Sequence, residues 1–308
     1  FMKKADLKKL KIVVLKGGLS KERGVSLVTG SAIAKELRAN GHDVAEIDIN
    51  KRDFSAVLKA KPDVVVNGLH GTYGEDGIIQ GMLEFYSIPY TGCGVLASAL
   101  VMDKAKAKEI MLSNNIPTPA FKVITDIKEL AGLKMKYPLY FKPVDNGSSV
   151  GVYLVKNLKE AKIAVNEILK IGRAVLVEQL IEGTEISLPV LNGRVLPVIE
   201  IIPQNEFYDY DAKYTAGKSA HIIPARLSKA ELKKASKAAL DTARALMCEE
   251  YVRVDIIMNK GVPYVLEANT LPGMTPTSLF PESAKAAGIS FYRLLTILIE
   301  GALKKKNV

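Results

Sequence analysis

The first ninety residues alternate between short apolar runs and segments with helical periodicity. Apolar runs at 11–18, 45–49 and 63–69 have the length and composition of strands, while residues 25–40 and 76–87 carry apolar side chains at helical spacing. Strands that alternate with helices predict a parallel α/β sheet, in which ligands bind at the carboxyl ends of the strands.

Glycines and polar residues cluster where two of these strands end. Gly17 and Gly18 are followed by Glu22, and His70 lies in a glycine-rich loop that also contains Glu75. These positions are candidates for ligand binding because they follow strands of the predicted parallel sheet. A histidine in such a loop can serve either structure or function, and both interpretations of His70 stay open.

The middle of the chain begins with a long predicted helix at 95–114 that ends at Pro117. The preceding Gly92-Cys93-Gly94 begins a match to the dinucleotide fingerprint G-x-G-x-x-A. No acidic residue ends a following strand at the expected distance, so a tight turn before the helix is the better interpretation. Further along, strands are predicted at 138–144, 150–155 and 174–181, with a helix at 158–171.

The last third of the chain is predicted to contain hairpins, a long loop and two helices. Asn192-Gly193 between apolar runs is a strong hairpin signal. Residues 203–226 are polar, contain aromatic residues and lack periodicity, which indicates a lid or binding loop. Residues 228–247 start with the Ser-x-x-Glu of a capping box, and residues 290–304 form the closing helix.

Two apolar runs around the turn at 259–261 predict a second hairpin, which carries three hard oxygen donors. Asp255 lies on its first strand, and Glu267 and Asn269, two residues apart, point to one face of its second strand. Oxygen donors of this kind hold Mg²⁺ against nucleotide phosphates. Because an unpaired carboxylate on a buried strand is costly, a bound metal explains these residues better than a half-exposed sheet does.

Composition narrows the class of protein. With 308 residues, 48% hydrophobic and 25% charged, the chain is expected to form two or three globular domains. The net charge of +10 is spread over predicted helix faces, and only 6% of the chain's residues are aromatic. This pattern favours solvated helix surfaces over a nucleic-acid-binding surface, and the positive field favours anionic small molecules as ligands. No apolar run approaches the roughly 20 residues of a membrane span. Cys93 and Cys248 have no metal-ligand spacing, and we expect free thiols in a cytoplasmic protein without a membrane partner.

A phosphate site is predicted around Lys142. The chain lacks the P-loop pattern, but Lys142 lies on a strand that leads into a Gly-Ser-rich turn at 147–151. Backbone N–H groups and hydroxyls of such a turn can cover phosphates while the lysine neutralises their charge. Glu178, near the end of the 174–181 strand, can accept a hydrogen bond from an exocyclic amine if the backbone after it binds an adenine edge.

Taken together, these segments resemble a known family. The matching segments, in chain order, are GGLSKERGVSL at 17–27, LHGTYGEDG at 69–77, MDKAKAK at 102–108, KPVDNGSSVGV at 142–152, VEQLIEGTE at 177–185, YDYDAKYTAGKS at 208–219, RVDI at 253–256 and LEANTLPGMTPTSL at 266–279. Their order and spacing are similar to those of the D-alanine–D-alanine ligases of the ATP-grasp superfamily, over essentially the whole chain.

The resemblance implies a fold of three domains. They are an N-terminal Rossmann-like α/β domain over 1–94, a central ATP-grasp subdomain over 95–181 and a C-terminal ATP-grasp domain over 182–308 with the lid at 203–226. The C-terminal half would be α+β, with the nucleotide held between two antiparallel sheets. The resemblance also implies ATP and two Mg²⁺ ions as cofactors, with Mn²⁺ able to substitute, and a homodimer as the assembly.

The resemblance also implies roles for individual residues. Nucleotide contacts would come from Lys104, Lys142, Ser149, Glu178, Gln179, Leu180, Ile181, Glu185 and Lys213. Asp255, Glu267 and Asn269 would hold the metals. The two D-alanines and the tetrahedral intermediate between them would be bound by Glu22, His70, Ser148, Lys213, Tyr214, Arg253, Gly273, Ser278 and Leu279.

The predicted reaction is ATP-dependent formation of D-alanyl-D-alanine through a D-alanyl phosphate, for peptidoglycan precursors. A ligase of the same fold that makes D-alanyl-D-lactate or another mixed product is the alternative. Tyr214 argues against the lactate reaction, because the depsipeptide-forming relatives tend to have Phe at that lid position. A non-catalytic nucleotide-binding protein on the same scaffold is a second alternative, and ATP binding without turnover would favour it.

Overall fold

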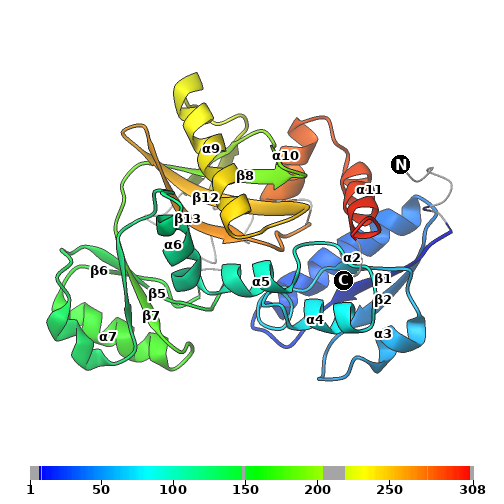
Figure 1. The fold of residues 1–308 in the computed structure, drawn as a ribbon, viewed down its shortest axis with the longest axis horizontal. Helices are drawn as coiled ribbons and strands as arrows, with labels where there is room; N and C mark the ends of the chain where they lie inside the picture. Colours follow the sequence, from blue (N-terminus) through cyan, green and yellow to red (C-terminus); the bar gives the residue numbers. More distant parts are fainter. Residues whose placement is uncertain (1–6, 8, 148–149, 204–218, 276, 306–308) are drawn as a thin grey trace.

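The computed structural model describes residues 7, 9–147, 150–203, 219–275 and 277–305, arranged around three β-sheets (Figure 1). The N-terminal sheet lies at one end of the molecule, and a small four-stranded sheet lies at the other. A six-stranded sheet lies between them in the chain's second half. In the described part of the chain, no helix combines the length and apolar character needed to cross a bilayer.

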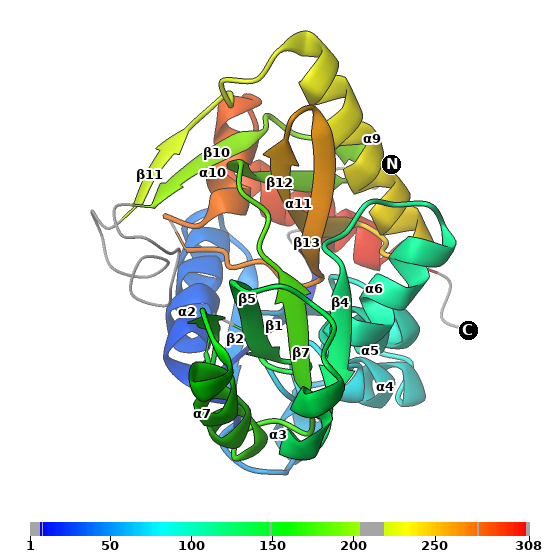
Figure 2. The same cartoon turned by 90° about the vertical axis from the view of Figure 1, so that its left-hand side faces the viewer.

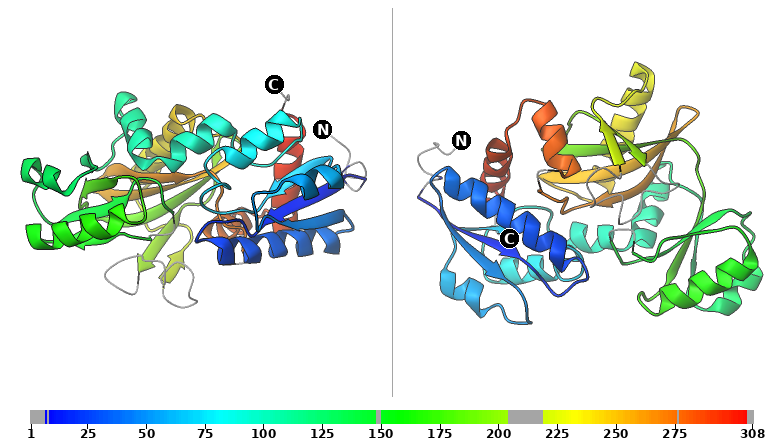
Figure 3. Two further views of the ribbon diagram at one scale, coloured as in Figure 1. Left: turned by 90° about the horizontal axis from the view of Figure 1, so that it is seen from below. Right: turned by 180° about the vertical axis from the view of Figure 1, so that it is seen from behind.

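The N-terminal sheet is parallel, as the alternating pattern predicted. Its order is β2 (Asp43–Asp48), β1 (Lys11–Lys16) and β3 (Val64–Asn67). The helices of this region are α2 (Arg23–Ala39), α3 (Ser55–Ala60) and α4 (Ile78–Phe85). The C-terminal helix α11 (Phe291–Ala302) also packs here, beside α2, since its leucines share a core with Ile12 and Val14 (Figure 3).

The helix predicted over 95–114 is two helices, so that prediction is wrong in one respect. α5 (Val95–Met102) ends at Asp103, whose backbone is extended at φ −85° and ψ 94°. The Asp103 carboxylate then accepts hydrogen bonds from the N–H groups of Ala105 and Lys106 and caps α6 (Lys104–Ser113). The break places Lys104 in the first turn of a new helix.

The four-stranded sheet is antiparallel in the order β4 (Phe121–Ile124), β7 (Val175–Gln179), β5 (Leu139–Pro143), β6 (Tyr153–Val155). A 3₁₀ helix, η1 (Ile127–Gly132), and α7 (Leu158–Leu169) pack against it. The edge strand β4 was not predicted, and the return strand predicted at 150–155 is shorter than expected.

The six-stranded sheet runs β11 (Ser219–Ile222), β10 (Ile199–Pro203), β8 (Thr184–Leu191), β12 (Tyr251–Asn259), β13 (Val262–Asn269), and β9 (Arg194–Val195) pairs with β8. Both predicted hairpins are confirmed, and the Asn192-Gly193 turn has positive φ at both residues, as a type I′ turn requires. The helix α9 (Lys229–Ala245) has its predicted capping box.

The segment predicted as an irregular lid at 203–226 is partly regular. Its end at Ser219–Ile222 is strand β11, which pairs with β10, and this hairpin projects from the edge of the sheet (Figure 2). Helix α10 (Leu279–Ala286) follows the loop after β13. The apolar face of α6 packs into the core of this sheet through Ala107 and Met111, so α6 bridges the central region and the C-terminal sheet.

Candidate functional site

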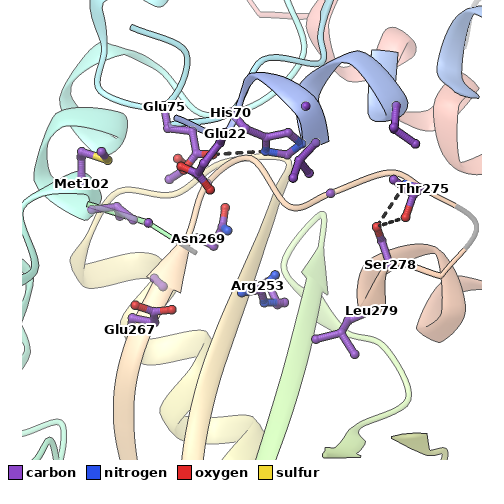
Figure 4. Close-up of a pocket in the computed structure, with 18 of the residues that line it drawn as sticks. Glu22, His70, Glu75, Met102, Arg253, Glu267, Asn269, Thr275, Ser278 and Leu279 are labelled. Atoms are coloured by element: carbon purple, nitrogen blue, oxygen red, sulfur yellow. Dashed lines mark hydrogen bonds and ion pairs between the residues drawn. The ribbon is translucent and has the colours of Figure 1, made fainter. Parts of the chain in front are cut away.

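A pocket of about 490 Å³ collects many of the predicted site residues from distant parts of the chain (Figure 4). The predicted residues that line it are Glu22, His70, Lys104, Arg253, Glu267, Asn269, Gly273, Ser278 and Leu279. Loops after β1 and β3 supply one wall, and β12, β13 and the loop before α10 supply the other. The structure therefore brings together residues that the sequence placed in five separate motifs.

The β12–β13 register confirms the predicted side-chain face. Asp255 pairs directly with Glu267, and Arg253 pairs with Asn269. Residues that lie opposite each other on antiparallel strands have their side chains on the same face of the sheet. Two carboxylates and an amide oxygen therefore lie on one face, which is a suitable donor set for Mg²⁺. Among the described residues, no group of three or more His, Cys, Asp or Glu side chains is suited to a metal.

The expectation that a buried carboxylate here lacks a partner is wrong. Asp255 is 7% exposed, but its carboxylate accepts hydrogen bonds from Arg253 Nε at 3.0 Å and from Arg253 Nη2 at 2.8 Å. Ser187 Oγ donates to Asp255 Oδ1 at 2.7 Å. A metal is thus not required to explain Asp255, although the donor set still fits one. The Glu267 side chain is more open, and Lys104 Nζ lies 3.8 Å from its Oε2.

The Glu22 carboxylate lies between two glycine loops. Glu22 is 8% exposed and immediately precedes α2. A Cβ added to Gly71 would lie 2.5 Å from Glu22 Oε2, and one added to Gly147 would lie 2.9 Å from the same oxygen. Gly71 also has φ +71°, which favours glycine. Glycine at both positions lets the loops approach the carboxylate closely, because a Cβ at either position would require the Glu22 carboxylate to move.

His70 is held on both sides of its ring. Its Nε2 lies 3.1 Å from Thr29 Oγ1, and its Nδ1 lies 3.3 Å from Glu75 Oε1. Glu75 also accepts a hydrogen bond from the Gly71 N–H at 3.0 Å. His70 therefore has both a structural role in the loop and a place in the pocket wall, beside Glu22 (Figure 4).

The opposite wall is a loop stabilised by hydroxyl groups. Ser278 Oγ lies 2.7 Å from Thr275 Oγ1 and accepts a hydrogen bond from the Thr275 N–H at 3.0 Å. Leu279 then begins α10. Asn269 Oδ1 accepts from the Leu271 N–H at 2.8 Å and fixes the start of the same loop.

A second cluster, of buried charges, lies between β5, β7 and α6. Glu178 Oε2 lies 2.5 Å from Lys142 Nζ, and Glu178 Oε1 lies 2.6 Å from Lys108 Nζ. Burial opposes ionisation of Glu178, but the two ammonium groups outweigh it and lower the pKa of the carboxyl group. Burial lowers the pKa of Lys108 to about 8, against the opposing effect of Glu178.

Lys104, one turn before Lys108 on α6, lines the pocket. Its Nζ donates to the backbone oxygen of Asn146 at 2.7 Å in the glycine loop and approaches Glu267. Gln179, Leu180 and Ile181 continue from Glu178 at the end of β7, and Glu185 lies on β8. None of these four residues lines the 490 Å³ pocket, and neither do Lys142, Glu178 and Asp255. Ser148, Ser149, Lys213 and Tyr214 lie outside the described residues.

Several residues of the site were not predicted from the sequence. Thr275 and Thr277 line the pocket within a segment whose resemblance was noted, and Val25 and Val28 of α2 supply an apolar side. Ser187 donates a hydrogen bond to the predicted residue Asp255, and Lys108 forms an ion pair with the predicted residue Glu178. Lys108 belongs to the family-like segment at 102–108, and that membership could have identified it as a candidate site residue.

Family models match most of the chain. "D-ala D-ala ligase N-terminus" matches residues 53–93, and "D-ala D-ala ligase C-terminus" matches residues 111–300. The D-alanine–D-alanine ligase of Geotalea uraniireducens is 46% identical over 303 residues, which cover 97% of this chain and 98% of the relative. The chain belongs to the D-alanine–D-alanine ligase family.

Solved structures agree with this membership. A D-alanine–D-alanine ligase from Bacillus anthracis, crystallised with ATP, is 34% identical with a TM-score of 0.85, and the match covers 96% of this chain and 98% of that one. VanG, a D-Ala:D-Ser ligase from Enterococcus faecalis, is 31% identical with a TM-score of 0.81, over 95% and 99% of the two chains. The predicted family and ATP-grasp fold are therefore confirmed.

Proposed function

We propose that this protein is an ADP-forming ligase that joins two D-alanine molecules into D-alanyl-D-alanine for peptidoglycan precursors. The observation that carries the proposal is the convergence of Glu22, Arg253, Glu267 and Ser278 on one pocket. Glu267 also acts electrostatically on Lys142. The relative from Geotalea uraniireducens, 46% identical to this chain over nearly its whole length, carries this activity in its name. We expect the protein to act in the cytoplasm as a homodimer.

Activation of the first D-alanine is the step that needs ATP. A carboxylate does not react with an amine, so its oxygen attacks the γ-phosphorus of ATP, and ADP leaves as the acyl phosphate forms. Lys104 and Lys142 would balance the phosphate charge, and Glu22 would hold the substrate ammonium. Mg²⁺ would be bound by Asp255, Glu267 and Asn269, where it neutralises phosphate oxygens, and Mn²⁺ would bind the same donors.

Peptide bond formation then needs an electrophile protected from water. The amine of the second D-alanine attacks the acyl carbon, and inorganic phosphate leaves from the tetrahedral intermediate. Arg253 and the Gly273 N–H line the pocket and would donate to the developing oxyanion. Ser278 would bind the carboxylate of the second D-alanine. Ser148 and Tyr214 would position the second D-alanine or help to deprotonate its amine. The predicted lid that carries Lys213 and Tyr214 would shield the acyl phosphate from water.

The direct test is ATP turnover with D-alanine as the sole amino acid, with products identified by mass. We expect ADP release that depends on D-alanine and yields D-alanyl-D-alanine. Nucleotide binding without turnover, in the presence of Mg²⁺ and D-alanine, would contradict the proposal and favour a non-catalytic protein.

The identity of the second substrate needs its own experiment, because the fold is shared with a D-Ala:D-Ser ligase. D-Serine and D-lactate should each be offered in competition with D-alanine. We expect the dipeptide of D-alanine to dominate at neutral pH, and we expect Tyr214→Phe to increase the ester product. If the wild-type protein made a mixed product as its main species, a ligase for D-alanine and a different second substrate would become the favoured function.

A further inference from the structure

Helix α6 presents two lysines, one turn apart, to two different surroundings. Lys104 lies at the pocket, where its Nζ contacts the glycine loop. Lys108 is 1% exposed and is among the largest fully buried side chains of the described chain. Burial of an ammonium group is expensive, and an apolar side chain of similar size would fill such a position at lower cost. The charge of Lys108 therefore calls for an explanation beyond packing.

The contacts of Lys108 connect both antiparallel sheets. Its Nζ donates to Thr118 Oγ1 at 2.6 Å and lies 2.6 Å from Glu178 Oε1 on β7 of the four-stranded sheet. Thr118 Oγ1 in turn donates to the backbone oxygen of Val265 at 2.8 Å, on β13 of the six-stranded sheet. Two residues beyond Val265 is Glu267, a predicted metal ligand. Lys108 thus lies on a continuous path from Glu178 to the strand of Glu267.

Two cations share one carboxylate in this cluster. Glu178 is paired with Lys142 as well as with Lys108, so either ammonium alone would neutralise it. Lys142 also lies on the strand that leads into the phosphate-binding turn. If Lys142 turns toward phosphates, Lys108 remains to hold Glu178 ionised and in place. Lys108 is therefore needed in the nucleotide-bound state, because without it the buried Glu178 carboxylate would have no cation beside it.

Glu178 also has capacity for a ligand. Among the described residues, Oε1 has no donor with hydrogen-bond geometry, although Lys108 Nζ is close to it in distance. A carboxylate oxygen accepts more than one hydrogen bond. An exocyclic amine of a nucleobase could thus donate to Glu178 while the ion pair with Lys108 persists.

We propose that Lys108 is a positioning residue that holds the Glu178 carboxylate for the nucleobase while Lys142 serves the phosphates. The proposal rests on the proposed function in one respect, which is that the nucleotide is an adenine nucleotide. In this proposal Thr118 also connects Lys108 to strand β13, which carries Glu267. Lys108 would therefore help to position both the nucleobase and the strand of a metal ligand.

The test measures the dissociation constants of ADP and IDP by titration calorimetry on the full chain. IDP carries an oxo group where ADP has the exocyclic amine, so its affinity does not benefit from an acceptor at Glu178. Lys108→Met should weaken ADP binding by about tenfold or more, because Glu178 loses a buried ion-pair partner, and should reduce the preference for ADP over IDP. Lys106→Met on the same helix is the matched control, because Lys106 is exposed and pairs with Glu109.

Thr118→Val is the second variant, since loss of a buried cation could prevent folding. It keeps the pair with Glu178 and removes the path to Val265, and we expect ADP to bind about threefold to tenfold more weakly. An unchanged ADP-to-IDP ratio in a folded Lys108→Met protein would overturn the proposal. If that variant does not fold, unchanged ADP affinity in Thr118→Val would overturn it. These dissociation constants are measured without turnover. A wild-type protein that binds ADP but makes no dipeptide would contradict the proposed reaction, and the test of Lys108 would still apply.

Discussion

The four-stranded and the six-stranded sheets carry charged clusters of opposite balance, and the side chains of the two clusters differ in their exposure to solvent. On β5, β7 and α6, two lysines surround one carboxylate, and Lys108 and Glu178 are both nearly inaccessible to solvent. We call these three residues the lysine cluster. On β12 and β13, two carboxylates accompany one arginine, and the side chain of Glu267 is 27% exposed. Asp255, Glu267 and Arg253 form the carboxylate cluster.

The difference indicates a division of work. Charges in the lysine cluster are largely shielded from solvent and lie in direct ion-pair contact, which suits the recognition of a base and of anionic phosphates. The carboxylate cluster borders an open pocket, so ligands such as a hydrated cation can reach Glu267. Nucleotide phosphates with bound Mg²⁺ carry both signs of charge and would meet a complementary cluster on each side.

Removal of one charge from the carboxylate cluster should abolish most of the turnover. Glu267→Gln keeps the shape of the side chain but weakens metal binding, and we expect kcat to fall by about a thousandfold, in line with several kcal/mol of charge stabilisation by the metal. Initial rates as a function of Mg²⁺ concentration provide the measurement. Asp241→Asn, on the surface of α9, is the control. An unchanged Mg²⁺ dependence in Glu267→Gln would refute the metal role.

A change in the lysine cluster should instead affect the nucleotide. Lys142→Met should raise the KM for ATP by about thirtyfold to a hundredfold, because a charged contact to phosphate is lost. The Mg²⁺ concentration for half-maximal rate, measured at saturating ATP, should stay close to that of the wild-type protein. Lys122→Met on β4 of the same sheet provides the control, since that lysine is exposed. A large shift in Mg²⁺ requirement without a change in KM would reverse the assignment of the clusters.

The pH dependence of the KM for ATP should report on Lys108, whose pKa is about 8 because burial disfavours its charged form. Below pH 8 the ammonium holds Glu178, and above pH 8 the neutral amine no longer does. The KM should therefore rise as pH passes through 8, by up to about tenfold if the whole ion pair is lost. Glu178, Lys142 and Glu267 are the charged groups that influence this lysine. In Lys108→Met the rise should disappear, and its persistence there would assign it to another group.

The smallest effect is expected from the hydroxyl behind Asp255. Ser187→Ala removes the 2.7 Å hydrogen bond to Asp255 Oδ1 but leaves the pairing with Arg253. We expect kcat to fall by about threefold to tenfold, the usual range for one buried hydrogen bond. Rates at saturating ATP and Mg²⁺ provide the measurement. A loss as large as that of Glu267→Gln would mean that Ser187 orients Asp255 more strictly than the contacts with Arg253 do.

Much of the fold could be predicted because local signals agreed with the tertiary structure. The β12–β13 hairpin combines period-two apolar patterning with a glycine turn, and its register follows from that turn. α9 was predicted within two residues at each end because its capping box and Ala-rich face both mark it. The parallel N-terminal sheet followed from strands and helices in alternation.

The errors arose where a short-range pattern was ambiguous. The apolar spacing continues across Met102 and Lys104, so the cap formed by Asp103 was read as one more helical residue. Strand β4 has four residues at a sheet edge, which is too short for a clear alternation. The strand at Ser219–Ile222 exists because β10 pairs with it, and that partner is distant from the local pattern.

The site was predicted unevenly for a similar reason. Residues such as Glu22 and Glu267 could be chosen because charged groups beside glycine turns or in apolar strands are unusual. Lys108 looks like any lysine on a solvated helix, and its burial depends on Thr118 and on Glu178, which is 70 residues away. The pairing of Arg253 with Asp255 was missed, although the two residues are on one face of β12.

The most direct test of the division between clusters is ADP binding by calorimetry with and without Mg²⁺, in wild-type protein and in the variants Lys142→Met and Glu267→Gln. We predict that Lys142→Met weakens ADP binding under both conditions. Glu267→Gln should leave metal-free binding close to wild type and remove most of the gain that Mg²⁺ provides. Equal losses in both variants, independent of Mg²⁺, would show that the two clusters act as one site and would contradict the account.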